Sequence, residues 1–493
     1  MNPARIGSGS PGEADPGHGL GWRFVISPVN MNQLLDYTDT IAALSTPPGV
    51  GALGVIRISG PEAIPVMASV FSGKDLTGQA GYTLHFGRIR DEQDHTLDEV
   101  VVGLFRAPHS FTGEDIVEIS CHGSPYILQE VLQLLVRKGI RLAKPGEFTQ
   151  RAFLHGKMDL TQAEAVADLI AATHRSAHDI ALSQMRGGIS RQIKDLREEL
   201  IHFASLIELE LDFSEEDVEF ANREQLRSLI ERILGTIRHL SDSFQLGNAM
   251  KEGVSTVLAG RPNAGKSTLL NALLEEERAI VSEIAGTTRD TIEENLSIQG
   301  IRFRLIDTAG IREAQDQIEA IGVSRTMEKI SESAILIYVF DVLAMTPAEV
   351  ERDVRSLARE GLTILLVPNK MDLNPYTKPE DYSSEWVDPE HIVPISAKNA
   401  QNIPYLKERL YATALAGARP EDDVLVSNAR HAEALYQAGG ALDAALSGLQ
   451  SGLTGDLLAE DIRQALYHLG EITGQVTTDD LLANIFGKFC IGK

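Results

Sequence analysis

The chain has 493 residues, of which 43% are hydrophobic, and its 45 lysines and arginines against 70 aspartates and glutamates give a formal net charge of −25. This length predicts two to four domains, and so negative a charge disfavours binding to DNA and to anionic membranes. A transmembrane helix is also excluded, because the most apolar run, residues 334–340, has only the length of a strand.

The first thirty residues are rich in glycine and proline and lack the apolar core of a signal peptide. Met31 then opens the first segment of globular character. We expect residues 1–30 to be a disordered tail or an artefact of start-site choice. The two cysteines of the sequence, Cys121 and Cys490, predict a reduced pair of thiols and a cytoplasmic protein rather than a disulfide.

Short strands and one helix are predicted next, in the segment that runs from Asp39 to about Lys157. Strand candidates are residues 54–60, 82–90, 98–105 and 115–120, and residues 125–139 have helical spacing. From Leu160 to about Met250 the pattern changes to long helices, the first with Thr161 as N-cap and Glu164 at N3 of a capping box. The acidic residues 207–220 are expected to be a solvated helix end and loop rather than a metal site.

Strands and helices alternate after that, and the helical pattern returns at Asn428. Six strands are predicted at 256–260, 295–300, 301–307, 334–340, 362–368 and 391–396, the second and third as a hairpin. The predicted fold class is multidomain α/β. It has an α+β domain at 31–152 and a helical domain in two parts, 153–252 and 412–493. Between the two parts lies an inserted P-loop G domain at 253–411, with a mixed six-stranded sheet and helices on both faces.

The segment GRPNAGKS at 260–267 matches the P-loop pattern G-x-x-x-x-G-K-[ST] between a predicted strand and a predicted helix. Gly260 and Gly265 let backbone N–H groups close around phosphates, and Lys266 adds a charge to the β- and γ-phosphates. Ser267 offers its hydroxyl to Mg²⁺, and the helix N-terminus adds its dipole.

Three further motifs follow in the order of a GTPase: DTAG at 307–310, NKMD at 369–372 and SAK at 396–398. Asp307 can reach the Mg²⁺ shell, and the Gly310 N–H can meet the γ-phosphate. Asp372 can accept the two N–H groups of a guanine edge, which adenine lacks, while SAK completes the base pocket. The four motifs together predict a GTP-binding domain.

The residues after DTAG differ from those of Ras-type enzymes, which place a glutamine there to orient the attacking water. Here Ile311 and Arg312 follow Gly310, and an isoleucine cannot orient water. Hydrolysis therefore needs another group. Asn263 could hold a monovalent cation near the phosphates, and Glu313 or Glu319 could orient water through a bridge.

Taken together, the sequence resembles the MnmE (TrmE) family of tRNA-modification GTPases from about Asp39 to Lys493. The resemblance is carried by the P-loop and DTAGIRE and by residues 45–61, 111–123, 141–170, 282–294 and FCIGK at 489–493. It implies a homodimer with a tetrahydrofolate-binding-like dimerisation domain at the amino end and a helical domain that carries the G domain.

The resemblance also implies an activity. With the flavoprotein partner MnmG, such a protein adds an aminomethyl or carboxymethylaminomethyl group to C5 of the wobble uridine of certain tRNAs. The one-carbon unit would come from 5-formyl- or methylene-tetrahydrofolate, and G-domain dimerisation in K⁺ would activate GTP hydrolysis. Because the chain is so acidic, we expect tRNA to bind mostly through the partner.

Site residues implied by the resemblance fall into four groups. The GTP contacts are Asn263, Ala264, Gly265, Lys266, Ser267 and Thr268; Ser282, Glu283, Ile284, Ala285, Gly286, Thr287 and Thr288; Asp307, Thr308, Ala309 and Gly310; Asn369, Lys370 and Asp372; and Ser396, Ala397 and Lys398. The Mg²⁺ ligands are Ser267 and Thr288, and the K⁺ ligands are Asn263, Ser282, Ile284 and Thr287. The folate contacts are Arg57, Glu118, Lys157 and Lys493. The residues with catalytic roles are Glu319, Lys266, Arg289, Arg312 and Cys490.

Two other functions remain as alternatives: a ribosome-assembly switch of the related Era type, and a folate-dependent one-carbon transferase that GTP regulates. The terminal FCIGK has alternatives of its own, because Cys490 stands where a prenylated cysteine would. A terminal lysine and an acidic chain argue against a lipid anchor. We expect the tail to reach the folate site, with Cys490 as a thiol near the chemistry or a packing residue.

Overall fold

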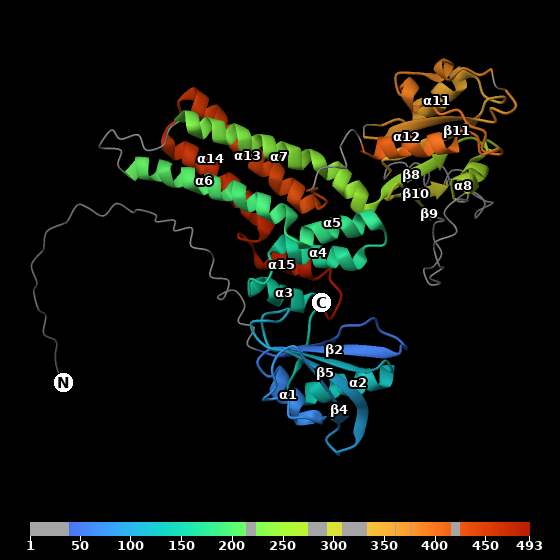
Figure 1. The fold of residues 1–493 in the computed structure, drawn as a ribbon. Coiled ribbons are helices and arrows are strands. Elements are labelled where there is room, and N and C mark those ends of the chain that lie inside the picture. The colour runs from blue at the N-terminus through green and yellow to red at the C-terminus, as the bar shows by residue number, and fades with distance from the viewer. Residues whose placement is uncertain are drawn as a thin grey trace, which may run out of the picture. The chain divides into compact units, whose positions relative to one another are not determined.

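The computed structural model describes residues 39–212, 223–274, 293–307, 333–359, 361–374, 376–415 and 424–493. These residues form a multidomain α/β protein of two sheets and many helices, as the sequence predicts (Figure 1). The tail predicted at 1–30 lies outside the described residues, as does most of the acidic stretch at 207–220. The domain boundaries given above stay predictions.

The amino-terminal part contains a seven-stranded sheet of order β3-β4-β5-β6-β2-β1-β7. Its strands are β1 (Ile41–Leu44), β2 (Leu53–Ser59), β3 (Phe71–Ser72), β4 (Thr83–Arg90), β5 (Thr96–Phe105), β6 (Ile116–His122) and β7 (Arg141–Leu142). Helices α1 (Ala63–Val70) and α2 (Pro125–Arg137) bury their apolar sides on the inward residues of β2, β5 and β6. The four predicted strands and the helix are confirmed. Strands β1, β3 and β7 have two to four residues each, too few to show a period.

The helical elements are α3 (Glu147–Leu154), α4 (Leu160–Ala171), α5 (Arg175–Met185), α6 (Gly188–Asp212), α7 (Arg223–Glu252), α13 (Ala429–Ser451), α14 (Gly455–Thr473) and α15 (Asp479–Phe486). Four of them, α6, α7, α13 and α14, lie lengthwise beside one another (Figure 1). They share one apolar core, which includes Leu200, Ile230, Leu442 and Ile462. Segments far apart in the sequence therefore build one bundle, as the interrupted helical pattern predicts.

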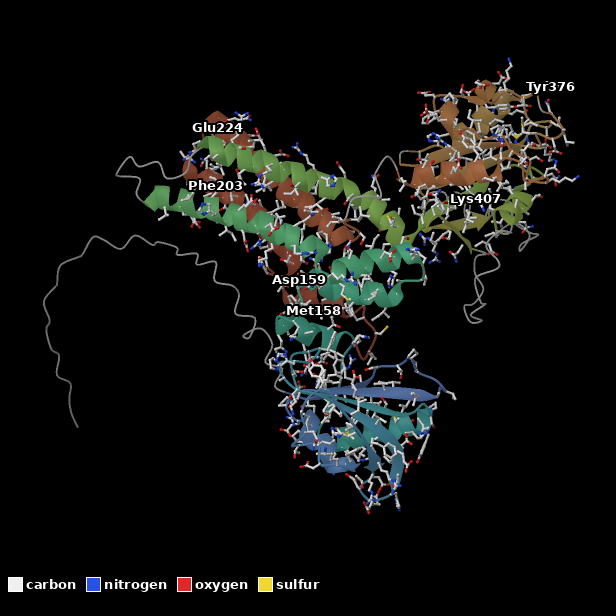
Figure 2. All side chains as sticks on the ribbon, viewed as in Figure 1. Met158, Asp159, Phe203, Glu224, Tyr376 and Lys407 are labelled. Atoms are coloured by element: carbon white, nitrogen blue, oxygen red, sulfur yellow. The ribbon has the colours of Figure 1, made fainter. Side chains whose placement is uncertain are left out.

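The start of α4 corrects the predicted capping box. Asp159, labelled in Figure 2, is the N-cap: its Oδ1 accepts from Gln162 N at 2.9 Å, and Gln162 Oε1 accepts from Asp159 N at 3.0 Å. The choice of Thr161 as N-cap was wrong, because Asp159 and Gln162 complete the same reciprocal pair two residues earlier. Glu164 instead binds Arg430, with 2.8 Å between Nη2 and Oε2.

The second sheet has the order β12-β11-β8-β10-β9. Its strands are β8 (Val254–Ala259), β9 (Glu293–Ile298), β10 (Ile301–Asp307), β11 (Ile335–Asp341) and β12 (Thr363–Asn369). Its helices are α8 (Lys266–Leu274), α11 (Pro347–Leu357) and α12 (Ile403–Leu415), with short 3-10 helices at Pro379–Tyr382 and Pro389–His391. Strand β9 is antiparallel to β10, which confirms the hairpin, and Gln299 and Gly300 at its turn have φ of 50° and 90°. The prediction of a sixth strand at 391–396 was wrong: the sheet has five strands in the described residues, and this segment adds only one isolated parallel bridge, Leu366 with Ile392, because a 3-10 turn at Pro389–His391 leads into it.

None of the helices in the described ranges is long and apolar enough to cross a membrane. Both cysteines are free thiols, Cys121 buried and Cys490 exposed. Burial raises the pKa of Cys121 to about 11, and the Asp98 charge adds to this. Burial and a raised pKa both disfavour the reactive thiolate form of Cys121.

Candidate functional site

The P-loop runs from the end of β8 to the start of α8. Its backbone conformation is one that few residue types can adopt. Gly260, Asn263 and Gly265 have φ of 151°, 62° and 97°. A Cβ on Gly260 would lie 2.0 Å from the Val339 carbonyl oxygen, so only glycine fits there. Lys266 is buried, and its Nζ donates to the carbonyls of Gly260 and Arg261 at 3.0 and 3.1 Å. The side chains of Ser267 and Thr268 are exposed at the helix N-terminus, where a phosphate and its metal would be met.

The NKMD and SAK motifs are joined to the P-loop by one buried amide, that of Asn369. Asn369 Nδ2 donates to Ala264 O at 2.8 Å, and Asn369 Oδ1 accepts from Ala397 N at 3.0 Å. Ser396 Oγ donates to Asp372 Oδ1 at 2.7 Å. The structure thus brings together three of the four motifs predicted from the sequence: the P-loop, NKMD and SAK. The Asp372 carboxylate is exposed and hydrogen-bonded on one oxygen, which suits the recognition of a base edge.

Two acidic residues near these loops were missed by the sequence analysis. Asp341 ends β11 and pairs with Lys370, with 2.7 Å between Oδ2 and Nζ. Asp353 on α11 binds the P-loop Arg261 through both carboxylate oxygens, at 2.8 and 3.1 Å. Burial raises the pKa of Asp353, but hydrogen bonds from Arg261 and Tyr338 outweigh it and hold that pKa below its ordinary value. Asp341 could have been found from the sequence, because it ends a buried strand. No sequence pattern marks Asp353 as a partner of the P-loop.

Several predicted site residues lie outside the described residues, so the structure does not place them. They are Ser282, Glu283, Ile284, Ala285, Gly286, Thr287, Thr288, Arg289, Thr308, Ala309, Gly310, Arg312, Glu313 and Glu319. The backbone of Asp307 is described as the last residue of β10, but its side chain is not.

A second group of charged residues gathers on the seven-stranded sheet. Arg57 on β2 faces Glu118 on β6, and Glu118 Oε1 accepts from Nε and Nη2 of Arg57 at 2.9 and 2.7 Å. The Arg57 guanidinium carbon lies 5.5 Å from the centre of the Phe111 ring and 5.7 Å from that of Phe148. Within the described residues, Arg57 Nη1 is buried without a hydrogen-bond partner. An orphaned guanidinium N–H in such a place suits an anionic or carbonyl oxygen of a ligand.

The carboxyl-terminal tail reaches this group. Burial and the Arg57 charge lower the pKa of Lys493, while Glu118 acts in the opposite direction. Gly146 N donates to Cys490 O at 3.4 Å, and Ser45 Oγ donates to Gly492 O at 3.4 Å. Gly492 has φ of 94°, and a Cβ there would lie 2.3 Å from the Leu44 carbonyl oxygen. The carboxyl-terminal tail thus binds Ser45 and Gly146 through a turn that needs glycine at position 492.

Lys157 lies beside the loop that carries Phe111. Its Nζ donates to Pro108 O at 2.9 Å, and its Cδ lies 3.4 Å from a Cβ built on Gly113. The four predicted folate residues therefore come from four segments: Arg57 and Glu118 form one ion pair, Lys493 shares their electrostatic surroundings, and Lys157 is held by the Phe111 loop.

Two family models match the chain. The model described as "MnmE helical domain" matches residues 160–490, and the model described as "GTP-binding protein TrmE N-terminus" matches residues 40–157.

Curated relatives extend the match over nearly the whole chain. It is 56% identical to the "tRNA modification GTPase MnmE" of Cytophaga hutchinsonii, over 93% of this chain and 98% of that protein. It is 52% identical to the protein of the same name from Christiangramia forsetii, over 92% of this chain and 99% of that one. Among solved structures, it is similar to the FeoB G-domain of Methanococcus jannaschii, at 20% identity and a TM-score of 0.24, over 33% of this chain and 97% of that one.

Proposed function

The chain belongs to the MnmE family of tRNA-modification GTPases, and from this premise we propose that it couples GTP hydrolysis to modification of the wobble uridine of tRNA. The product is an aminomethyl or carboxymethylaminomethyl group on C5 of that base, made together with the flavoprotein MnmG. The observation that carries the proposal is the coexistence of two sites in one chain: nucleotide loops after β8 and β12, and a cation-lined site at Arg57.

The nucleotide loops support GTP as the substrate. Lys266 and the Ser267 hydroxyl stand where a β,γ-phosphate and its Mg²⁺ are met in P-loop enzymes. The proposed Mg²⁺ ligands are Ser267 and Thr288. A K⁺ ion would be held by Asn263, Ser282, Ile284 and Thr287, and Asn263 fits this role because it is exposed at a left-handed turn of the P-loop. In the chemistry proposed here, the cation supplies the countercharge and Glu319 orients the water, with Arg289 and Arg312 near the phosphates.

The Arg57 site supports a folate as the source of the one-carbon unit. A reduced folate offers a pterin ring with an amide edge, a formyl or methylene carbon, and a glutamate tail. The Glu118 carboxylate suits the amide edge, and the cations of Arg57, Lys157 and Lys493 suit carbonyl or carboxylate oxygens. The orphaned Nη1 of Arg57 supports a ligand oxygen in this place. Cys490 is exposed on the tail that ends beside this site, which favours a role in the chemistry over packing.

A bare apolar face supports the homodimer. Leu84, Phe86 and Val101 are 75%, 68% and 37% exposed. Phe86 is directly opposite Val101, and Leu84 is opposite Gly103, which in turn pairs with Glu118. The patch therefore adjoins the Arg57–Glu118 pair on the same face of the sheet, and a second copy would cover it. The net charge of −25 favours MnmG as the main tRNA-binding surface, in the cytoplasm.

The experiment that tests the proposal compares tRNA nucleosides by mass spectrometry from cells with and without the gene. Loss of the modified wobble uridine on deletion, and its return on complementation, is the expected result. Complementation with Cys490→Ser is expected to restore GTP hydrolysis but not the nucleoside. Unchanged wobble uridines in the deletion strain would contradict the proposal and favour an Era-type switch, or a one-carbon transferase that works without tRNA.

A further inference from the structure

The loop at residues 106–115, which joins β5 to β6, touches two of the proposed folate residues. Its Phe111 ring lies 5.5 Å from the Arg57 guanidinium carbon, and its Pro108 carbonyl accepts a hydrogen bond from Lys157 at 2.9 Å. The position of this loop therefore helps to orient both cations, together with the Glu118 carboxylate that binds Arg57. The question is what holds the loop.

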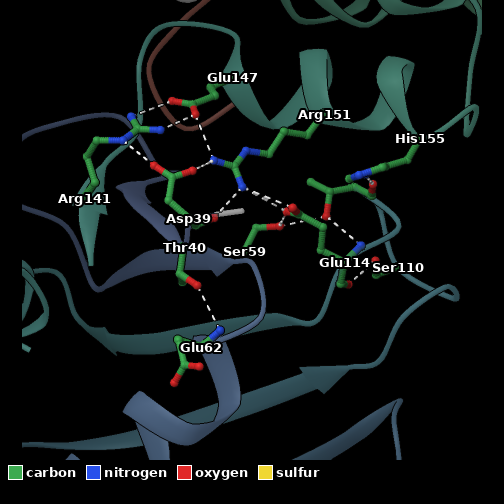
Figure 3. A network of polar contacts seen from close by, with 11 residues as sticks. Asp39, Thr40, Ser59, Glu62, Ser110, Glu114, Arg141, Glu147, Arg151 and His155 are labelled. Atoms are coloured by element: carbon green, nitrogen blue, oxygen red, sulfur yellow. Dashed lines mark hydrogen bonds and ion pairs between the residues drawn. The ribbon is translucent and has the colours of Figure 1, made fainter. Parts of the chain in front are cut away.

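Glu114 is the loop carboxylate that reaches a buried cation, Arg151. Its Oε1 accepts from Arg151 Nη1 at 3.1 Å, and its Oε2 accepts from Ser59 Oγ at 2.6 Å (Figure 3). At the start of the loop, the partly exposed Arg106 donates to the backbone carbonyls of Thr77 and Gln79 at 2.6 and 2.8 Å. Neutral donors act further along the loop. Ser110 Oγ donates to Glu114 O at 2.6 Å, and His155 Nδ1 lies 2.7 Å from Thr112 O. Glu114 is thus the residue that ties the loop to a buried cation.

Arg151 lies on α3 and has no exposed surface. Besides Glu114, its guanidinium donates to the Asp39 backbone carbonyl at 2.8 Å, to Asp39 Oδ1 at 2.7 Å and to Glu147 Oε1 at 3.0 Å. Arg141 completes the network with hydrogen bonds to Glu147 and Asp39. Figure 3 shows Arg151 between Glu147 on one side and Glu114 on the other.

The same helix carries the second wall of the Arg57 site. Phe148 is fully buried on α3, and its ring centre lies 5.7 Å from the Arg57 guanidinium carbon. Arg151 therefore fixes both rings that flank Arg57: Phe148 through its own helix, and Phe111 through Glu114. A buried cation with this many partners fixes geometry more strongly than a neutral contact does.

The opposite charges of this network nearly cancel, which favours the ionised form of each of its side chains. Its two guanidinium groups and three carboxylates leave a single net negative charge. Burial raises the pKa of Glu147, yet hydrogen bonds from Arg141, Lys144 N and Arg151 outweigh it and lower that pKa. Removing the charge of Glu114 would leave two cations and two anions, so the cluster would lose its link to the loop without gaining an uncompensated charge.

We propose that Arg151 and Glu114 are positioning residues of the folate site: they clamp the 106–115 loop to α3 and so orient Arg57 and Lys157 toward the ligand. This inference deepens the proposed folate function and rests on it. Neither residue is assigned contact with the ligand.

The test uses the full-length protein with Glu114→Gln, which keeps the size of the side chain. Binding of 5-formyltetrahydrofolate is measured by titration calorimetry, and hydrogen exchange of the 106–115 peptide is measured without folate. We expect the affinity to fall about tenfold and the loop amides to exchange at least about tenfold faster. Arg151→Lys keeps the charge but cannot reach all three carboxylates, and it should act in the same direction.

Asp98→Asn is the matched control, because Asp98 is another buried carboxylate of this domain, with 7% exposure against 10% for Glu114, and it binds His122 outside the network. This variant should leave folate affinity within about twofold. If Glu114→Gln binds folate as wild type does, or its loop exchanges no faster, the inference is overturned. It is likewise overturned if Asp98→Asn loses as much affinity. Absence of binding by the wild-type protein would instead defeat the proposed folate function itself.

Discussion

The nucleotide loops and the Arg57 site position their groups in different ways. In the nucleotide loops, the backbone positions the functional groups: Gly260 and Gly265 adopt positive φ, and Lys266 and Asn369 bind backbone carbonyls. In the Arg57 site, side-chain charges bind one another across segments distant in sequence, as Arg151 binds Asp39 and Glu114. A site of the first kind should fail when a single methyl group is added. A site of the second kind should fail when a single charge is removed.

The largest expected effect is on stability, from removing a charge in the network. Glu147 has no exposed surface and faces two guanidinium groups, so Glu147→Gln should lower the free energy of unfolding by about 4 kcal/mol. Because hydrogen bonds lower its pKa from the ordinary 4.5, Glu147 stabilises the fold fully above about pH 4.5, and this contribution is lost as the pH falls through the folded-state pKa. Urea titrations of the wild-type and variant proteins at pH 7 and below pH 4 measure this contribution to the free energy of unfolding. A variant as stable as wild type at pH 7 would show that the network is dispensable.

The next effect is on nucleotide binding, from adding a methyl group to the P-loop. A Cβ at Gly265 would lie 2.3 Å from Asn369 Nδ2, and φ there is 97°. Gly265→Ala should therefore weaken GTP binding by about 3 kcal/mol, which is on the order of 100-fold. The control is Gly235→Ala in α7, where a Cβ meets nothing within 4 Å and the substitution should stabilise the helix by up to about 1 kcal/mol. Titration with a fluorescent GTP analogue measures the affinity of both variants. Wild-type affinity in Gly265→Ala would contradict the steric argument.

A smaller effect concerns which base is bound. Asp372→Asn turns an acceptor of the guanine N–H groups into a mixed donor and acceptor, so preference should move from GTP toward XTP by about 2 kcal/mol. Competition between the two nucleotides measures the change. Retained preference for GTP would remove Asp372 from the base pocket.

The smallest effect compares an exposed ion pair of the seven-stranded sheet with the buried network around Glu147 on α3. Arg88 and Glu99 form an ion pair with side chains 53% and 51% exposed. Arg88→Ala should change the free energy of unfolding by less than about 1 kcal/mol. A loss as large as that of Glu147→Gln would mean that burial does not distinguish these pairs.

The two regions also differ in how far the sequence alone predicts them. Each nucleotide loop is a contiguous motif, so its chemistry can be predicted from a few neighbouring residues. Asn369 joins the P-loop, NKMD and SAK, and the motifs follow the expected order. Arg57, Glu118, Lys157 and Lys493 are single charges in unrelated segments, and only the family resemblance singled them out.

Two other features were missed, for different reasons. The Asp159 cap was missed because Thr161 offers a similar local signal two residues later. Glu147 stands four residues before Arg151 on α3, a local spacing that the sequence analysis passed over. Asp39 and Glu114 could not be found in this way, because they meet Arg151 only through the tertiary fold.

The most direct test of two separate sites in one chain is the modified wobble uridine content of tRNA from cells whose only copy carries Arg57→Ala. This residue lies outside the nucleotide loops, so purified Arg57→Ala should hydrolyse GTP within about twofold of the wild-type rate. The modified nucleoside should fall to the level of the deletion strain. Full modification in these cells, with the variant protein present at wild-type amounts, would contradict the claim that the Arg57 site takes part in the reaction.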